Sequence, residues 1–390
     1  MMCMRQGNPR RPGRPDRLRV LMLVDRLRRG GAERLLVGLA AHLPRERFEV
    51  AVCTTRAEHG RLLEDLQAAD VEHIAIDRRY RFDLAGLRRL GALFRGRRFH
   101  VLHAHKFGSN VWGTLLGRLF RVPVVIAHEH TWSYEGKPLR RLLDGRLIGR
   151  FADVFVAVSK RDRDRMISLE GVPPQKVALM RNAYVPRAPR GKQRWRELLG
   201  IPVEAPVVAT ACALRPQKAL EVLIEAFARL SSSFPAAHLL IAGEGPCREA
   251  LERDADRHGV SDRTHFLGWL EDLPGFLSEV DVAAMSSDYE GTPLFALECM
   301  AGRVPLVSTE VGGIGDVLDA GRSVLLVPRR DSRALAGALE SLIQDPELRA
   351  AVAAAAGERL RPFEIARVAG DFADLYERLY AGSGQGNGSG

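Results

Sequence analysis

The chain has 390 residues, of which 46% are hydrophobic and 27% charged, a composition that is typical of a folded globular protein and excludes a disordered or fibrous one. Single hydrophobic cores stop growing at about 250 to 300 residues, so the length predicts two domains with a ligand-binding cleft between them. The formal charge of +10 is uneven, because residues 1–190 carry +19 and residues 191–390 carry −9. A basic half attracts a membrane surface, nucleic acid or a phosphorylated substrate.

Charged residues interrupt every apolar run well before the roughly 18 to 20 residues that span a bilayer. The basic, proline-rich start also lacks the apolar segment of a secretion signal, so we expect a cytoplasmic location. The five cysteines form no C-x-x-C pair, which argues against a disulfide framework and against a zinc site.

Short apolar runs alternate with helical patterns, which predicts an α/β protein of parallel, doubly wound sheets with helices on both faces. A basic, disordered segment is expected at 1–18 and a first domain at 19–185. Its predicted strands lie at 19–24, 48–54, 100–105, 123–130 and 153–159.

The alternation lapses at 182–194, where prolines, a glycine and arginines interrupt the pattern, so the domain boundary is placed between 185 and 186. A second doubly wound domain is predicted at 186–362, followed by a helix at 363–381 and a flexible tail at 382–390. The strands of the second domain are expected at 205–212, 238–243, 264–269, 281–287, 304–309 and 323–328.

Two glycines follow the first strand, at the carboxyl edge where parallel sheets bind ligands. Gly30 and Gly31 precede a helix expected from about Ala32, and paired glycines let the backbone approach a ligand closely. The spacing matches neither G-x-G-x-x-G nor a P-loop, which disfavours dinucleotide and Walker-type nucleotide binding.

Four histidines stand at the ends of two later strands of this domain: His103, His105, His128 and His130. We predict that they form hydrogen bonds in the cleft. Metal ligation is the alternative, but no carboxylate or cysteine set accompanies them at a recognisable spacing, so no metal ligands are assigned.

In the second domain, Arg215 and Lys218 follow the strand at 205–212. Two cations at a strand end are natural partners for a diphosphate and would stabilise a departing nucleoside diphosphate. The alternative is an exposed turn with two solvated charges.

The strongest pattern is SSDYEGTPLFALECMAG at 286–302. Glu290 lies in a loop after a strand, and Thr292 is predicted to cap a helix whose first turn holds Pro293 and which carries Glu298. Both carboxylates can face the cleft, and free helix N–H groups between them suit a phosphate. A nucleotide sugar has phosphates in its middle and hydroxyls at both ends, so it fits this arrangement. A helix cap with a surface glutamate is the alternative.

The order and spacing of these motifs resemble glycosyltransferase family 4, retaining enzymes with two Rossmann-like domains in the GT-B arrangement. The resemblance spans about residues 19 to 381. The motifs that carry it are GGAE at 30–33, VSK at 158–160, QK with LIEAF at 217–227, GEGP at 243–246, FLG at 266–268, EG…E at 290–298 and GGIGDVL at 312–318.

The resemblance implies roles at matching positions. Glu298 corresponds to the residue that binds the donor ribose, and Lys218 to the lysine that binds the diphosphate. Glu290, which would contact the donor sugar, and His130, close to the transferred sugar, are the candidate catalytic residues, with His128 as the alternative to His130. The remaining donor-binding positions are Gly31 and the amides of 291–295, including Gly291, Thr292 and Leu294.

The chain also departs from the family pattern. The commonest pattern has an arginine five residues before the diphosphate lysine, where this chain has Ala213, so Arg215 is the expected substitute. Ala219 and Ala183 replace glycines, and Asp316 replaces the commoner glutamate.

The resemblance further implies retaining transfer from a UDP- or GDP-sugar to a glycan or lipid-linked acceptor, with no metal or other cofactor and with front-face attack by the acceptor hydroxyl. Domain closure would exclude water, and the helix at 363–381 would control the hinge. A nucleotide-sugar epimerase is one alternative, although it would be expected to lack GGAE and EG…E. A non-catalytic scaffold is another. Nucleic-acid binding is disfavoured because no recognition motif or aromatic platform is present.

Two arginine-rich stretches, 84–99 and 138–150, combine helical apolar spacing with arginines on the other face. This pattern and the basic first half predict peripheral contact with an anionic membrane, in which case the acceptor is lipid-linked or anionic. Solvated helix faces packed on the sheet are the alternative.

Overall fold

The computed structural model describes residues 15–28, 30–57, 60–80, 83–130, 138–187 and 194–383. Most of the predicted basic start and all but two residues of the predicted tail lie outside these ranges. Two ends of these segments were misplaced, because Leu18 already belongs to the first strand and the last helix continues to Ser383.

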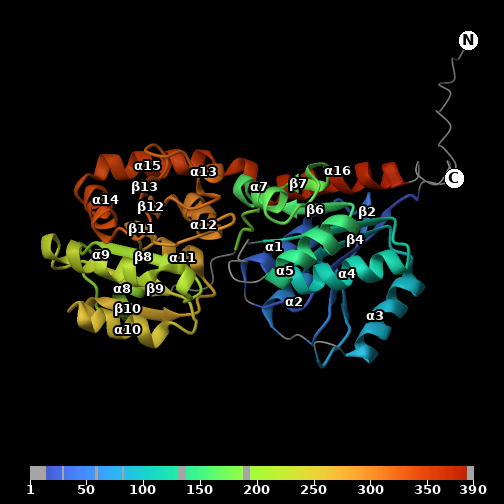
Figure 1. Ribbon diagram of the computed structural model, residues 1–390. Helices are drawn as coiled ribbons and strands as arrows, with labels where there is room; N and C mark the ends of the chain where they lie inside the picture. The colour runs from blue at the N-terminus through green and yellow to red at the C-terminus, as the bar shows by residue number, and fades with distance from the viewer. Residues whose placement is uncertain are drawn as a thin grey trace, which may run out of the picture.

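Two fully parallel sheets form the framework of the molecule, one in each half of the chain (Figure 1). The first has the order β3-β2-β1-β4-β5-β6-β7 and the second the order β10-β9-β8-β11-β12-β13. The strands of the first sheet are β1 (Leu18–Val24), β2 (Phe48–Thr54), β3 (Glu72–Ala75), β4 (Val101–His105), β5 (Val124–His128), β6 (Val154–Ala157) and β7 (Val177–Leu179). Those of the second are β8 (Val207–Ala211), β9 (His238–Ala242), β10 (Thr264–Gly268), β11 (Val282–Met285), β12 (Leu306–Thr309) and β13 (Leu325–Val327).

Helices connect the strands and cover both faces of each sheet, as predicted. In the first half they are α1 (Gly31–His42), α2 (Arg61–Ala68), α3 (Leu84–Arg97), α4 (Phe107–Leu119), α5 (Pro138–Leu143), the π-helix η1 (Asp144–Ile148), α6 (Gly149–Phe151), α7 (Lys160–Ser168) and η2 (Pro174–Lys176). In the second half they are α8 (Trp195–Leu198), η3 (Pro216–Lys218), α9 (Leu220–Ser233), α10 (Arg248–Arg257), η4 (Ser261–Arg263), α11 (Leu273–Leu277), α12 (Leu294–Gly302), α13 (Ile314–Val317), α14 (Ser332–Gln344), α15 (Pro346–Glu358), η5 (Arg361–Phe363) and α16 (Ile365–Ser383). None of the helices in the described ranges is long and apolar enough to cross a membrane.

Every strand expected from the sequence is present, but the sequence did not indicate β3 and β7. Both lie at edges of the first sheet, and their residues are exposed or only half-buried. An edge strand is packed less completely than a central one, so it needs no long apolar run.

Alternate residues of the central strands pack into different cores, as the two-residue period of a strand requires. In β1, Val20 and Met22 join a core formed with α1 and α16, whereas Leu21 and Leu23 face a core that includes α3 and α4. The second sheet is covered in the same way, by α9 and α14 on one face and by α11 and α12 on the other.

The last helix returns to the first half of the molecule, where α16 lies beside the first sheet (Figure 1). Phe372 and Tyr376 are fully buried in the core that contains α1, and the Tyr376 ring meets Phe48 edge to face at 5.9 Å. The amide of Ile365 donates to the carbonyl of Tyr184 at 3.1 Å, where the chain crosses back. The predicted GT-B architecture with a crossing C-terminal helix is therefore confirmed.

The strand orders also fix where a ligand binds. Each sheet reverses its winding at one point, between β1 and β4 in the first and between β8 and β11 in the second. The crevices beyond these strand ends are the ligand sites of doubly wound sheets.

Candidate active site

Lys218 and Glu290 meet beyond β8 and β11, at the reversal point of the second sheet. Lys218 Nζ lies 2.5 Å from Glu290 Oε1, and Ser287 Oγ donates to the same oxygen at 2.7 Å. Burial opposes the charge on Lys218, but the carboxylate of Glu290 outweighs it and raises the lysine pKa. The ammonium group is therefore fixed as a cation at the crevice.

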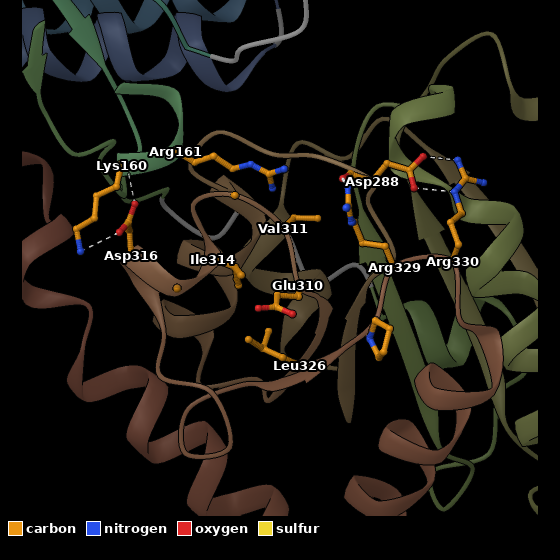
Figure 2. Close-up of a pocket in the computed structure, with 13 residues that line it drawn as sticks. Lys160, Arg161, Asp288, Glu310, Val311, Ile314, Asp316, Leu326, Arg329 and Arg330 are labelled. Carbon is orange, nitrogen blue, oxygen red and sulfur yellow. Dashed lines mark hydrogen bonds and ion pairs between the residues drawn. The ribbon is translucent and has the colours of Figure 1, made fainter. Parts of the chain in front are cut away.

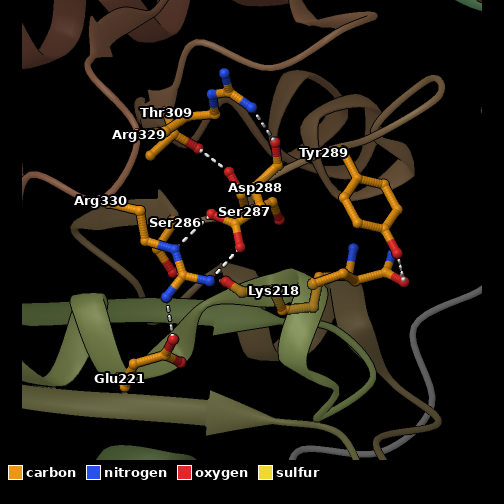
Figure 3. Close-up of polar contacts among 10 residues, drawn as sticks. Lys218, Glu221, Ser286, Ser287, Asp288, Tyr289, Thr309, Arg329 and Arg330 are labelled. Atoms are coloured by element: carbon orange, nitrogen blue, oxygen red, sulfur yellow. Dashed lines mark hydrogen bonds and ion pairs between the residues drawn. The ribbon is translucent and has the colours of Figure 1, made fainter. Parts of the chain in front are cut away.

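The loop that carries Glu290 is held from several sides (Figure 3). Arg330 donates to both carboxylate oxygens of Asp288 through two nitrogens, one of which lies 2.6 Å from Asp288 Oδ1. Ser286 Oγ donates to the carbonyl of Lys218 at 2.9 Å, and Thr309 Oγ1 donates to the carbonyl of Ser287. These contacts, from β12, η3 and the turn after β13, hold the Glu290 side of the loop from within the second half.

Helix α12 begins differently from the prediction. It starts at Leu294 with Pro293 at the N-cap, and no side chain caps it. Thr292 was expected to cap the helix, but its hydroxyl donates to the carbonyl of Val158 in the first half at 2.7 Å. The buried carbonyl beyond β6 competes successfully for the hydroxyl, and no side chain takes up the first amides of α12.

Glu298 is buried on α12 beside two arginines, Arg187 and Arg34, that its sequence motif did not indicate. Arg187 Nη2 lies 3.0 Å from Glu298 Oε1, and the two side chains are 14% and 10% exposed. Burial raises the pKa of Glu298, although Arg187 and Arg34 act against this. Arg34 comes from α1, so charges from the first half and from the connecting segment converge on this carboxylate.

Gly31, at the start of α1, lies against Leu294, at the start of α12. A side chain at Gly31 would collide with the Leu294 side chain, so glycine permits this close approach. The four helices that follow the strands at the two reversal points, α1, α4, α9 and α12, have no side-chain N-cap bond. Of these, α1 and α12 meet directly, which brings two positive helix ends together, as an anion site requires.

The four predicted histidines form one buried, hydrogen-bonded cluster. His103 bonds through Nδ1 to the Tyr376 hydroxyl at 2.7 Å and through Nε2 to His128 Nδ1 at 3.2 Å. His105 Nδ1 lies 3.1 Å from His130 Nε2. Burial lowers the pKa of all four, that of His128 to about 3, so the cluster is neutral at ordinary pH.

The structure distinguishes His130 from His128, the two alternatives for the histidine close to the transferred sugar. His128 is fully buried and its ring packs against Phe372 of α16, whereas the carbonyl of His130 would lie 2.7 Å from a Cβ on Gly291. His130 therefore touches the Glu290 loop. Nitrogens of His103, His105 and His128 lie within 4.8 Å of one another, which would suit a metal, but the hydrogen bonds already account for much of the arrangement.

A hollow of about 840 Å³ opens on the other side of the Glu290 loop, between the first turn of α7 and α13 (Figure 2). Lys160 Nζ lies 3.3 Å from Asp316 Oδ1, and the Lys160 amide donates to the other oxygen at 2.9 Å. The motif at 158–160 and the one at 312–318 thus join the two halves, a role that no spacing within the sequence indicated.

Comparison with known proteins agrees with this geometry. Residues 29–186 match the family model "Glycosyltransferase Family 4", and residues 191–359 match "Glycosyl transferases group 1". The chain is 30% identical over 306 residues to D-inositol 3-phosphate glycosyltransferase of Corynebacterium efficiens, covering 72% of each protein. The chain belongs to glycosyltransferase family 4.

Two further relatives show how widely the fold is shared. The enzyme is 28% identical over 304 residues to alpha-D-kanosaminyltransferase of Streptomyces kanamyceticus, covering 71% of this chain and 77% of that one. Anabaena HepE, solved in complex with UDP-glucose, superposes with a TM-score of 0.82 at 21% identity, covering 93% of this chain and all of HepE. This glycosyltransferase is thus a retaining GT-B enzyme that uses a nucleotide sugar.

Proposed function

We propose that the enzyme transfers a sugar from a UDP-sugar, or a GDP-sugar as the alternative donor, to a hydroxyl of a glycan or lipid-linked acceptor, as in polysaccharide or cell-envelope biosynthesis. The observation that carries the proposal is the placement of Lys218, Glu290 and Glu298 around the uncapped start of α12. The UDP-glucose bound by HepE supports the choice of a uridine nucleotide.

Each part of the donor then has a protein counterpart. Lys218 and the backbone N–H groups within 291–295, those of Thr292 and Leu294 among them, bind the diphosphate, with Pro293 the exception because it has no N–H. Glu298 accepts hydrogen bonds from the ribose hydroxyls, and Glu290 accepts them from the transferred sugar. Gly31 lets α1 approach the phosphates.

The transfer itself needs no covalent intermediate with the protein. The acceptor oxygen attacks the anomeric carbon on the face from which the nucleotide leaves. The bond to the diphosphate oxygen breaks, and that oxygen takes the acceptor proton, so configuration is retained. Lys218 and the helix ends stabilise the negative charge on the leaving group. We therefore expect the rate to survive excess chelator in an assay of transfer.

His130 lies beside the transferred sugar in this proposal. Its ring is held by His105, and its carbonyl abuts Gly291, so it is oriented from both halves. A neutral imidazole can donate one hydrogen bond to a sugar hydroxyl and remain uncharged.

The donor enters when the halves move apart. The cavity beside Lys218, Glu290 and Leu294 measures about 30 Å³, the space of about one water molecule. Because Leu294 also touches Gly31, a nucleotide sugar can reach Lys218 only if the start of α1 withdraws from α12. Closure behind the donor would then exclude water, with α16 and the segment before it as the hinge.

A thermal-shift comparison tests the donor site. UDP, GDP, ADP and CMP are added to the native enzyme and to Glu298→Ala. A ligand at 100 times its Kd adds about 2.7 kcal/mol of stability. We expect UDP to raise the melting temperature of the native enzyme and to have little effect on the variant. No shift with any nucleotide would contradict the proposal.

We also propose that the enzyme acts in the cytoplasm and binds the anionic inner surface of the membrane through its basic first half. The arginine-rich helix α5 exposes Leu139 and Leu142, which are 68% and 46% accessible, beside Arg140 and Arg141. Helix α3 contributes less than its sequence suggested, because its apolar residues Leu90 and Phe94 are buried in the core of the first half.

Co-sedimentation with vesicles tests the membrane contact. Binding to phosphatidylglycerol vesicles at low salt, but not to neutral vesicles, is expected, and Arg141→Gln with Leu142→Gln should weaken it. Failure to bind anionic vesicles at low salt would contradict this proposal.

A further inference from the structure

In the second half of the chain, Lys218 is held in place by a partner, but the expected second cation of the diphosphate site is not. Ala213 stands where the family's commonest pattern has arginine, and Arg215, the expected substitute, is exposed. The Arg215 side chain makes no hydrogen bond or ion pair with any described residue, although it lies close enough for its charge to oppose the charge on Lys218. Lys218 is therefore the fixed cation of this half, whereas the ligand carries at least two negative charges.

Arg187 supplies a guanidinium group beside Glu298 of α12. It belongs to the segment that connects the two sheets, and its Nη2 contacts Glu298 at 3.0 Å. Its Nε is buried without a hydrogen-bond partner, so the fork of donors is only partly used. A guanidinium group with vacant donors is suited to bind phosphate oxygens in pairs.

Arg34 adds a second guanidinium group at the same place. It lies on the first turn of α1, three residues after Gly31, and its side chain makes no hydrogen bond or ion pair with another described residue. Burial and the nearby charge of Arg187 lower its pKa to about 10, although Glu298 acts against them. Both cations thus lie near the Glu298 carboxylate, with Asp65 as a second acidic neighbour of Arg34, and an incoming anion would relieve their mutual repulsion further.

We propose that Arg34 and Arg187 form the second cationic arm of the donor-diphosphate site, which closes on the phosphates from the side opposite Lys218. The inference rests on the proposed function and specifies how the same site binds its donor. Leu294, one helical turn before Glu298, touches Gly31, so the two arginines border the uncapped starts of α1 and α12. When the ribose hydroxyls donate hydrogen bonds to Glu298, the guanidinium N–H groups donate to the phosphate oxygens instead.

In this arrangement the three cations that bind the diphosphate come from different parts of the chain. Lys218 comes from the second half, Arg34 from the first half and Arg187 from the segment between them. The diphosphate then draws the halves together, because its charge is fully compensated only when all three contacts form. A nucleoside without phosphates gains nothing from the two arginines.

Calorimetric titration of the full-length enzyme with UDP, UMP and uridine tests the inference. The variants are Arg34→Gln and Arg187→Gln, with Arg215→Gln as the rival position and Arg257→Gln as a matched control, since Arg257 is an exposed arginine of α10. We expect Arg34→Gln and Arg187→Gln each to weaken UDP binding by about tenfold or more, the loss of one charged hydrogen bond. The affinity for uridine should change by less than about twofold. The loss of affinity for UMP should lie between the losses for uridine and UDP.

The outcomes separate the alternatives. Equal losses for UDP and uridine in Arg187→Gln would mean that Arg187 only positions Glu298, and would overturn the inference. A selective loss of UDP affinity in Arg215→Gln alone would overturn it in favour of Arg215. If Arg187→Gln is unstable, Arg187→Lys keeps the charge and should retain part of the UDP affinity. Absence of binding by all three ligands to the native enzyme would refute the proposed function itself.

Discussion

The two glutamates of the 290–298 motif are held in opposite ways. Glu290 is fixed by Lys218 and Ser287, which belong to the same half of the chain. Glu298 lies eight residues later, on α12, where Arg187 from the connecting segment holds it and the charge of Arg34 from α1 acts on it.

This contrast indicates that the two ends of one short motif have different functions. The Glu290 carboxylate is paired with Lys218 within the second half, so its position is fixed before the first half adds the contacts of His130 and Val158. The Glu298 end completes its charge balance only when the first half is in place, so nucleotide binding and closure are coupled there. The predictions below test whether the two ends are independent in this sense.

The largest effect is expected at the self-contained end, in Lys218→Met. The variant removes the cation that stabilises the leaving diphosphate, and loss of one such group costs about 10² to 10³ in rate. It also leaves Glu290 as a buried, unpaired charge, which destabilises a fold by about 3 to 5 kcal/mol. Turnover of the donor and unfolding in urea measure the two effects separately.

The double variant Lys218→Met with Glu290→Gln provides the control. Removal of both charges should restore most of the lost stability, because neither partner remains uncompensated. Activity should stay low. If stability did not recover, the pair would not be the local unit that the structure indicates.

The next effect concerns pH and Asp162, a buried carboxylate of α7 that faces Gly291 across the halves. Burial raises its pKa to about 6, although a hydrogen bond with Ser159 acts against this. The folded state therefore holds a proton between about pH 4 and 6 that the unfolded state has lost, so this group reduces stability as pH rises through that window.

Asp162→Asn should remove this dependence. A shift of roughly two pKa units corresponds to about 3 kcal/mol, so the variant should be more stable than the native enzyme by up to that amount at pH 7.5 and equal to it near pH 4. Urea unfolding at both values measures this. If the Glu290 end is self-contained, kcat at pH 7.5 changes little, and a large loss of kcat would argue against independence.

Much of this arrangement was predictable from the sequence, and the exceptions have physical causes. Central strands such as β1 and the positions of Lys218 and Glu290 after their strands follow from local apolar runs and turns. The contact of Arg187 with Glu298 spans 111 residues and depends on how the halves meet, so no spacing could indicate it. The edge strands β3 and β7 lacked a signal because they are only partly buried.

Local preference was misleading at two places. Thr292 has the side chain and position of an N-cap, but a carbonyl from the other half takes its hydroxyl. The apolar spacing of α3 resembles that of a membrane-surface helix, but the sheet buries that face. In both cases a tertiary partner decided between two locally reasonable outcomes.

A smaller effect is expected at the dependent end, in Glu298→Gln. The amide keeps the size of the side chain but loses the charge that pairs with Arg187, and a hydrogen bond to a charged group is worth about 1.5 to 3 kcal/mol. We expect uridine and UDP to lose affinity together, by about tenfold to a hundredfold. The exposed Glu310→Gln, on the hollow beside the Glu290 loop, is the matched control and should leave both affinities unchanged.

The smallest effect is expected in Thr292→Val, which removes the direct hydrogen bond between the Glu290 loop and the first half. Valine has nearly the shape of threonine, so the change leaves the Val158 carbonyl without this donor and costs about 1 to 2 kcal/mol of stability. Because Lys218 and Ser287 still hold Glu290, kcat should fall by less than about fivefold, a barrier change under 1 kcal/mol. A loss near that of Lys218→Met would show that the Glu290 end also depends on the other half, and the contrast between the two glutamates would disappear.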